Sequence, residues 1–503
     1  MGKTFYAEQR ESMNSKLKIC LFCLSFPSLE FVLFFWIMIG MNDRAKRYIG
    51  DRDFYRMLLA IAVPIMIQNG FTNFVSMLDN IMVGRLGTEQ MSGVAIANQL
   101  VFIYNLCIFG GLSGAGIFTA QFYGKNDNEG IRHTFRFKLI LATILTVVAI
   151  IVLSAFGEQL IGIYLHSSED GGDLAFALKS GMDYMEVVFL GMFPFMLVQV
   201  YSSTLRECGE TVLPMKAGVA AVFVNLIFNY LLIYGKFGFP YMGVRGAAVA
   251  TVISRFVEAG IVLVWTHCHK AENPYIEGLY RSLKVPKQLC LNITTKGLPL
   301  LLNEALWSSG MALLVQCYSM RGLNAVAGVN IAETLNNVFK VVFLAFGSSV
   351  GIIIGRLLGA GRMEEAKDTD RKIIVFSIFI SAILGVFMAA ISGVFPKIYN
   401  TNDAARHIAT ILILAQAVCL PLNAFKNATY FTLRSGGRTF ITFLFDGGFV
   451  WAVSLPTAFI LSRFTNASVL WIFIGVQIGE FLKAFLGYVL VEKGVWIRNI
   501  VTE

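Results

Sequence analysis

Residues 64–87 of the 503-residue chain read PIMIQNGFTNFVSMLDNIMVGRLG. The stretch predicts a membrane-spanning helix with a proline, Pro64, near its start and a single carboxylate, Asp79, near its end. Proline removes a backbone hydrogen bond and lets a helix bend, whereas a carboxylate inside a membrane span is so costly that it indicates a function. The two residues lie about 22 Å apart along an α-helix. We therefore expect a bendable, ion-sensitive helix at this position.

The composition is typical of a membrane protein. Hydrophobic residues make up 56% of the chain and charged residues 15%, and the mean hydropathy is +0.66, whereas soluble domains carry about 25% charged residues. So little polar surface cannot cover a globule of this size, which predicts an all-α polytopic membrane protein. The net charge of +9 then indicates basic loops against anionic lipid headgroups rather than nucleic-acid binding.

Apolar stretches long enough to cross about 30 Å of hydrocarbon recur along the chain and predict twelve transmembrane helices. They lie near residues 57–82, 94–121, 137–163, 179–204, 211–234, 246–267, 294–319, 329–357, 373–396, 405–433, 440–462 and 468–491. Lysine and arginine are concentrated in alternate connections, so the positive-inside rule places both termini in the cytoplasm. We expect a monomeric, multi-pass protein of the cell's cytoplasmic membrane.

Residues 1–40 form an extension ahead of the first clean span. The stretch is apolar but interrupted by Pro27 and Glu30, and no small-residue cleavage site precedes Met41. Three interpretations stand. We favour a misread start with Met41 as the initiator; the others are an extra peripheral helix and a signal peptide.

The twelve spans fall into two halves that repeat each other. Residues 64–136 pair without a gap with residues 299–371, and many of the shared residues are Gly, Pro or Ala. We predict an N-terminal six-helix bundle over 41–267, a polar cytoplasmic linker over 268–293 and a C-terminal six-helix bundle over 294–503. Six spans per half make the repeat parallel, with a pseudo-two-fold axis along the membrane normal, and such proteins usually hold substrate between the halves.

Motifs for covalent or nucleotide chemistry are missing from the sequence, which has no nucleotide-binding loop, no Gly-x-Ser-x-Gly and no HExxH. The eight cysteines are scattered, mostly in apolar stretches, and we interpret them as small packing residues rather than disulfides or metal ligands. We therefore expect that the protein is not an enzyme and that it needs no cofactor beyond a coupling ion. Transport would be driven by an ion gradient or run downhill.

A first group of polar residues is predicted around Asp79. Asn225 and Asn229 are four residues apart and share one face of the fifth span, and Thr251 begins the sixth. The oxygens of Asp79, Asn225 and Thr251 would suit Na⁺, and a proton on the carboxylate is the alternative. Two structural interpretations stay open: Asp79 reaches the outer interface, or the asparagines simply bond helices together.

A second acid, Glu304, lies five residues after Pro299 in the seventh span. We predict a cation-binding or coupling role for Glu304, and the alternative is a structural partner for Lys340 or Lys426. An apolar, aromatic cavity containing an acid would suit bulky cations. The residues expected to line such a substrate cavity are Asn303, Trp307, Lys340, Asn423 and Lys426.

Other charged residues in the spans are interpreted as structural. Asp446 is expected to interact with a helix terminus or with Arg438. Local pairs are expected between residues spaced i,i+3 on one helix, namely Arg255 with Glu258 and Glu480 with Lys483.

From about residue 45 onward the chain resembles the MATE family of multidrug and toxic compound extrusion transporters. The resemblance rests on AVPIMIQN, MLDNIMVGRLG, AQFYGKND with its repeat GRLLGAGRMEEA, LRECGETVLP, NLIFNYLLIYGKFGFPYMGVRGAAVATVISR, GLPLLLNEALWSSG and YFTLRSGGRT. It covers essentially all twelve spans. It implies two six-helix bundles in a V shape that work by alternating access.

The resemblance also implies roles for single residues. Pro64 matches the bending proline of the first helix, and Asp79 matches the acid implicated in proton or Na⁺ coupling. Asn225 and Thr251 match the polar neighbours of that acid. Glu304 matches the acid of the seventh helix in other members.

Four residues depart from the family pattern. Asn229 and Asn423 stand where some members have Asp, so each half carries one carboxylate fewer. This puts the identity of the ion and the strength of the coupling in question. Lys340 and Lys426 are unusual for the family and would favour substrates other than simple cations.

We therefore expect a secondary active antiporter, coupled to H⁺ or Na⁺, that exports organic and mainly cationic amphipathic compounds. The alternative is a lipid-linked oligosaccharide flippase of a related fold. A flippase would need a more cationic central cavity for pyrophosphate, which Lys340, Lys426 and Arg255 make conceivable. A non-transporting membrane enzyme or scaffold would leave paired intramembrane acids without a function.

Overall fold

A computed structural model describes residues 48–164, 173–399 and 401–502; the predicted extension over 1–40 lies outside these ranges. Within them the chain is helical and contains no strand. The helices are α3 (Arg52–Gly84), α4 (Thr88–Gly124), α5 (Asn128–Tyr164), α6 (Leu174–Glu207), α7 (Val212–Tyr234), α8 (Gly243–Cys268), η2 (Pro274–Ile276), η3 (Leu279–Arg281), α9 (Lys287–Ser319), α10 (Leu323–Gly359), α11 (Met363–Ile391), η4 (Phe395–Ile398), α12 (Asp403–Ser435), α13 (Thr439–Phe443), η5 (Leu444–Gly448), η6 (Val450–Ser454), α14 (Leu455–Phe464) and α15 (Val469–Glu492).

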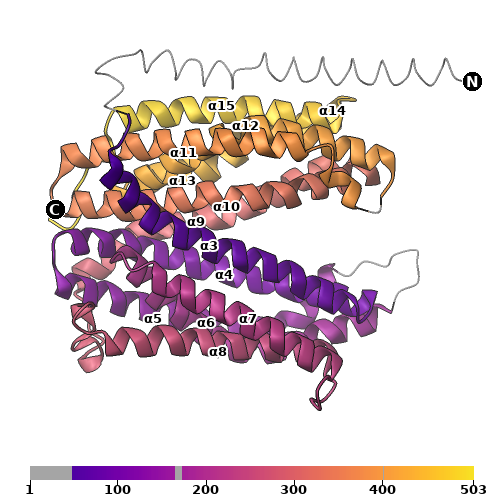
Figure 1. The fold of residues 1–503 in the computed structure, drawn as a ribbon, viewed down its shortest axis with the longest axis horizontal. Coiled ribbons are helices and arrows are strands. Elements are labelled where there is room, and N and C mark those ends of the chain that lie inside the picture. Colours follow the sequence, from indigo (N-terminus) through magenta and orange to yellow (C-terminus); the bar gives the residue numbers. More distant parts are fainter. Residues whose placement is uncertain (1–47, 165–172, 400, 503) are drawn as a thin grey trace, which may run out of the picture.

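Among the described residues, twelve helical spans are long and apolar enough to cross a membrane, with α13 to α14 counted as one. This confirms the predicted all-α, twelve-span class. In Figure 1, α5–α8 gather on one side of the molecule and α11–α15 on the other, with α3, α4, α9 and α10 between them. Each half has apolar cores of its own.

Two helices exchange contacts between the halves. The start of α3 packs through Leu58, Ile61 and Ile65 into a core built mainly by the second half. Conversely, Ile293 near the start of α9 belongs to the core of the first half. The first helix of each half therefore contributes to the core of the other half.

The ends of α4 and α10 cross with almost no space between their backbones. A Cβ atom on Gly124 would lie 2.0 Å from the carbonyl oxygen of Arg356, and one on Gly359 would lie 1.9 Å from that of Gln121. Gly124 pairs with Gly359 in the sequence repeat, as Gln121 pairs with Arg356. The crossing is therefore reciprocal, which places a pseudo-two-fold axis through it.

The C-terminal tail covers the same end of the molecule. The backbone N–H of Ile500 donates to Gln121 Oε1 at 2.8 Å, and Gln121 Nε2 donates to the carbonyl oxygen of Ser435 at 3.0 Å. The side chain of Asn499 donates to the carbonyl oxygen of Gly359 at 3.2 Å. These bonds join both halves to the tail and close this end.

Pro64 lies inside α3, as the sequence predicts. Because proline has no N–H, the carbonyl of Ala60 one turn earlier loses its helical partner. The hydroxyl of Thr211, which precedes α7, donates to that carbonyl oxygen at 3.2 Å. The vacated backbone group is thus satisfied by a neighbouring helix, as apolar surroundings require.

The segment between the halves is folded onto the first half. Tyr275, Ile276 and Leu279 are buried, and Arg136 on α5 donates from Nε to the carbonyl oxygen of Leu279 at 2.8 Å. Helix α9 already begins at Lys287, inside the range predicted as a linker. Apolar residues in a polar stretch thus anchor this segment to α5.

The eleventh span is continuous but changes its winding. Between α13 and α14 the segments η5 and η6 are π-helical. A π-turn places an extra residue in the helix, and such turns are frequent at functional sites. Asp446 lies in the first of these turns.

Candidate functional site

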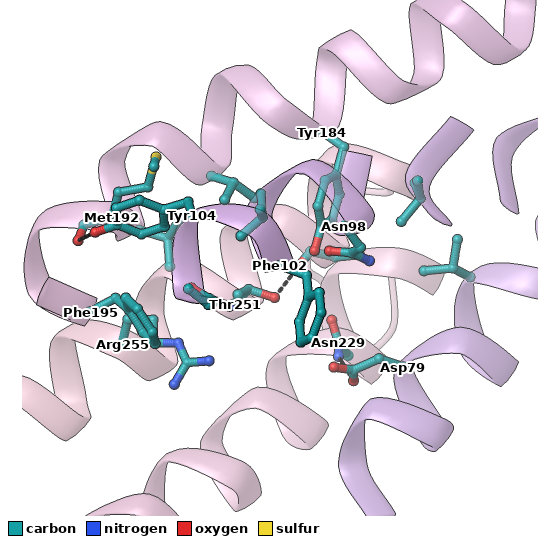
Figure 2. A pocket seen from close by; sticks show the side chains of 18 residues that line it. Asp79, Asn98, Phe102, Tyr104, Tyr184, Met192, Phe195, Asn229, Thr251 and Arg255 are labelled. Atoms are coloured by element: carbon teal, nitrogen blue, oxygen red, sulfur yellow. Dashed lines mark hydrogen bonds between the residues drawn. The ribbon is translucent and has the colours of Figure 1, made fainter. Parts of the chain in front are cut away.

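The first half encloses a cavity of about 300 Å³ between α3, α4, α6, α7 and α8. Asp79, Asn229 and Thr251 line it together with Tyr184 and Arg255. Figure 2 shows Asp79 and Asn229 side by side in one part of this cavity, and Arg255 beside Phe195 in another. The remaining wall is apolar apart from Asn98, Tyr104 and Asn105.

The structure brings the four residues of the predicted first group together. Asn229 Nδ2 donates to Asp79 Oδ1 at 2.6 Å and also approaches Asn225 Oδ1 at 3.0 Å. Asn225 Nδ2 donates to Thr251 Oγ1 at 3.3 Å. The chain of contacts thus runs from α3 through two turns of α7 to α8.

Of the two orientations of the Asn225 amide, the second satisfies its hydrogen-bonding groups better. In the first, its oxygen faces Asp79 and Asn229 while its nitrogen faces Thr251. In the second, its nitrogen donates to Asp79 Oδ1 at 2.9 Å and to Oδ2 at 3.2 Å. An amide oxygen facing a carboxylate requires a proton or a cation between them, whereas an amide N–H suits the bare carboxylate.

These residues also fit a small hard cation. Asn229 Oδ1 is buried and has no hydrogen-bond partner, although buried oxygens are normally satisfied. Carboxylate, amide and hydroxyl oxygens are the ligands that hard cations prefer. In the described part of the chain, no group of three or more His, Cys, Asp or Glu residues could hold a metal, so amide and hydroxyl oxygens would have to contribute.

Sequence reasoning missed several residues of this cavity. Tyr184 is buried, and its side chain lies beside those of Asn98 and Thr251 (Figure 2). Asn98 and Asn105 line the cavity from α4. Single polar residues in an apolar span are a usable signal, and both asparagines on α4 carried it. Tyr184 carried none, because a tyrosine in a span is commonly a packing residue.

In the second half, Glu304 lies on α9 and accepts a hydrogen bond from the Tyr430 hydroxyl at 3.3 Å. Its neighbour Asn303 is buried and links α9 to the π-helical turn. Asn303 Oδ1 accepts from the N–H of Gly447 at 2.8 Å, and its Nδ2 donates to Asp446 Oδ2 at 3.1 Å.

Two ion pairs join helices of the second half, and their partners differ from those predicted from the sequence. Lys483 on α15 binds Asp446 at 2.8 Å, and Lys426 on α12 binds Glu480 at 2.5 Å. Ser454 Oγ also donates to Glu480 at 2.8 Å. Lys426 therefore pairs with neither Glu304 nor Asp446, and Asp446 binds Lys483 and Asn303 rather than Arg438. The π-helical segments η5 and η6 orient the side chains of Asp446 and Ser454 toward α15.

One of the two local ion pairs predicted from i,i+3 spacing is present in the structure. Arg255 and Glu258 form an ion pair at 2.9 Å within α8. Glu480 and Lys483 instead bind residues of other helices. Both of these side chains are almost fully buried, so each requires a neutralising partner close by.

The residues predicted to line a substrate cavity are dispersed. The ammonium group of Lys340 lies 5.5 Å from the centroid of the Trp307 ring, a cation–π contact. Asn423 lies half-buried on α12. Neither the cavity around Asp79 nor a second cavity between the halves is lined by Asn303, Trp307, Lys340, Asn423 or Lys426.

Twelve spans in two repeated bundles, with an acid and amides in an internal cavity, define a membrane transporter. The MatE family model matches residues 64–231 and 299–460. The chain belongs to the MatE family, whose members are transporters and not enzymes. This confirms the resemblance seen in the sequence motifs.

Similar proteins include the probable multidrug resistance protein NorM of Thermotoga maritima, which is 26% identical and aligned over 88% of this chain and 93% of its own. The probable multidrug resistance protein YoeA of Bacillus subtilis is 23% identical over 89% and 96%. Among solved structures, MATE in complex with MaL6 has a TM-score of 0.78 at 22% identity, covering 90% of this chain and 98% of its own. An outward-facing multidrug resistance MATE transporter has a TM-score of 0.77 at 21% identity, with the same coverage.

Proposed function

We propose that the protein exports organic compounds in exchange for H⁺ or Na⁺ by alternating access. The observation that supports this most directly is the oxygen cluster at Asp79. Asn229 Oδ1 lies buried and unpaired beside a carboxylate, and the nitrogen of the Asn225 amide can donate to that carboxylate. Such a cluster suits a group that alternates between a bare and an ion-bound state.

The proposed cycle couples this cluster to the helices between the two halves. With the ion bound, the Asn225 oxygen faces Asp79; after its release the amide turns and donates to the carboxylate. Asp79 lies near the end of α3, whose start packs through Leu58 and Ile61 into the core of the second half. Binding at one end of α3 would thereby bias the packing of the two bundles at the other end.

The proposed substrates are organic, mainly cationic amphipathic compounds, exported from the cytoplasmic membrane by a monomer with both termini in the cytoplasm. Support comes from the relatives, which are named as multidrug resistance proteins. The Asp79 cavity supports it chemically, because its carboxylate and aromatic side chains can bind the cationic end of an amphipathic molecule. Arg255, which also lines the cavity, is paired with Glu258.

Reconstitution in proteoliposomes tests the proposal. Efflux of a fluorescent amphipathic cation is measured under a proton gradient alone, a sodium gradient alone and neither. We expect one gradient to drive efflux and Asp79→Asn to reduce it about 10-fold or more, within the range of typical coupling free energies. The control is Asp403→Asn, because the Asp403 side chain is 99% exposed at the start of α12. Full gradient-driven efflux by Asp79→Asn would refute the coupling role.

A further inference from the structure

A second cavity, of about 140 Å³, lies between the two halves beside the α4–α10 crossing. Its walls come from both bundles in pairs related by the sequence repeat. The pairs are Ser113 with Ser348, Gly116 with Gly351, and Arg206 of LRECG with Arg434 of LRSGG. The cavity therefore surrounds the pseudo-two-fold axis, with one arginine contributed by each half.

Both arginines keep donor capacity that the protein does not use. Arg206 Nη2 donates to Gln68 Oε1 at 3.0 Å, but its Nε is buried without a partner. Arg434 stacks on aromatic rings, with its guanidinium carbon 5.4 Å from the centroid of Phe431, and its Nη1 is buried without a partner. Buried N–H groups of charged side chains normally find acceptors, so each arginine has room for one further acceptor, such as an anionic group.

The nearby acids do not supply that group. Glu207 lines the cavity but is ion-paired with Lys138 of α5, whose side chain is fully buried. Glu304 interacts electrostatically with Arg434, yet it does not line the cavity and accepts from Tyr430. Among the residues that line the cavity itself, Arg206 and Arg434 are basic and Glu207 is the single acid.

We propose that this cavity binds the carboxylate of an aromatic substrate between Arg206 and Arg434. Guanidinium groups bind carboxylates through paired N–H donors, and the remaining wall includes Phe109 and Phe431 for a ring. The volume suits a carboxylated ring rather than a whole drug-sized molecule, since whole-ligand pockets span about 300–1,000 Å³. The inference rests on the proposed export function and assigns a carboxylate-binding subsite to this cavity.

Isothermal titration of the purified protein with benzoate and with benzamide, at constant ionic strength, tests the site. The two probes share the ring and differ in the charge of one group. We expect benzoate to bind at least about 10-fold more tightly than benzamide, because hydrogen bonds to charged groups are stronger than those between neutral groups. Arg206→Gln and Arg434→Gln should each weaken benzoate binding about 10-fold and leave benzamide unaffected.

Arg245→Gln is the matched control, because Arg245 is 55% exposed and pairs with Asp183 away from this cavity. Arg206→Lys keeps the positive charge and tests the site even if the Gln variant misfolds. It should retain the melting temperature of the unmodified protein and lose part of the benzoate affinity. Absence of benzoate binding, equal binding of benzamide, or benzoate binding unchanged in both arginine variants would each overturn the proposal. Asp79→Asn should still bind benzoate, so this variant distinguishes a failure of the coupling proposal from a failure of the carboxylate site.

Discussion

Gly124 and Gly359 end α4 and α10 by lying against the backbone of each other's helix. Gly124 faces the carbonyl of Arg356, and Gly359 faces the carbonyl of Gln121. Gln121 and Arg356 correspond to each other in the repeat, and each lies three positions before the glycine of its own helix. The contact thus depends on the absence of a side chain at two equivalent positions. It also explains why glycine recurs at both places in the repeat.

Gly124→Ala should open this crossing. Its Cβ atom would lie 2.0 Å from the Arg356 carbonyl oxygen, and overpacking of this kind costs about 1–3 kcal/mol. We expect a lower melting temperature and faster labelling of a cysteine placed at Ser435. Gly162→Ala on α5 is the control, because nothing lies within 4 Å of its Cβ position. Equal melting temperatures for the two variants would contradict the close approach.

Thr211→Val should destabilise the protein by leaving the Ala60 carbonyl without a donor. An unsatisfied buried acceptor costs about 1–3 kcal/mol. In a Pro64→Ala background the residue at position 64 regains its N–H, so the same change should cost much less. Melting temperatures of the two single variants and the double variant give this comparison. Additive effects would show that Thr211 does not compensate for the proline.

Lys426→Met should be strongly destabilising, because it leaves Glu480 buried without its cation. Removing one partner of a buried pair costs about 3–5 kcal/mol, whereas apolar replacement of both is often neutral. Lys426→Met with Glu480→Leu should therefore recover most of the lost stability. Asp183→Asn, which breaks a largely exposed pair with Arg245, should cost about 0–1 kcal/mol. Thermal unfolding in detergent distinguishes these outcomes.

Asn229→Ala should impair coupling without abolishing substrate binding. It removes the donor 2.6 Å from Asp79 and the unpaired Oδ1 together. We expect gradient-driven efflux to fall about 5- to 10-fold, as for typical coupling energies, while downhill efflux persists. Asn336→Ala, which removes an amide on α10 that donates to Glu333 at 3.4 Å, serves as the comparison. A variant with normal gradient dependence would exclude Asn229 from the coupling site.

The twelve spans, the repeat and the cluster around Asp79 could be predicted from sequence, because each rests on local or periodic information. Asn225 and Asn229 share a helical face by spacing alone. The partners of Lys426 and Lys483 could not be predicted in this way. They depend on the rotation of α12 and on π-helical turns that displace Asp446, and no residue pattern marks such turns.

Contacts that join distant segments were also beyond sequence reasoning. The buried segment after α8 is held by the Arg136 side chain of α5, which donates to its backbone, and backbone acceptors leave no trace in a sequence. The cavity between the halves is a similar case. Both arginine motifs were visible, but only the packing of the bundles places Arg206 and Arg434 around one cavity.

The exchange of α3 between the bundles has a consequence for biosynthesis. Leu58, Ile61 and Ile65 belong to a core that includes Phe346 and Val350, which the ribosome produces nearly three hundred residues later. Until α10 and α12 enter the bilayer, this face of α3 is left to lipid or to an insertion chaperone. Assembly of the first bundle can therefore be completed only after the second has been inserted, so the two halves cannot mature as independent units.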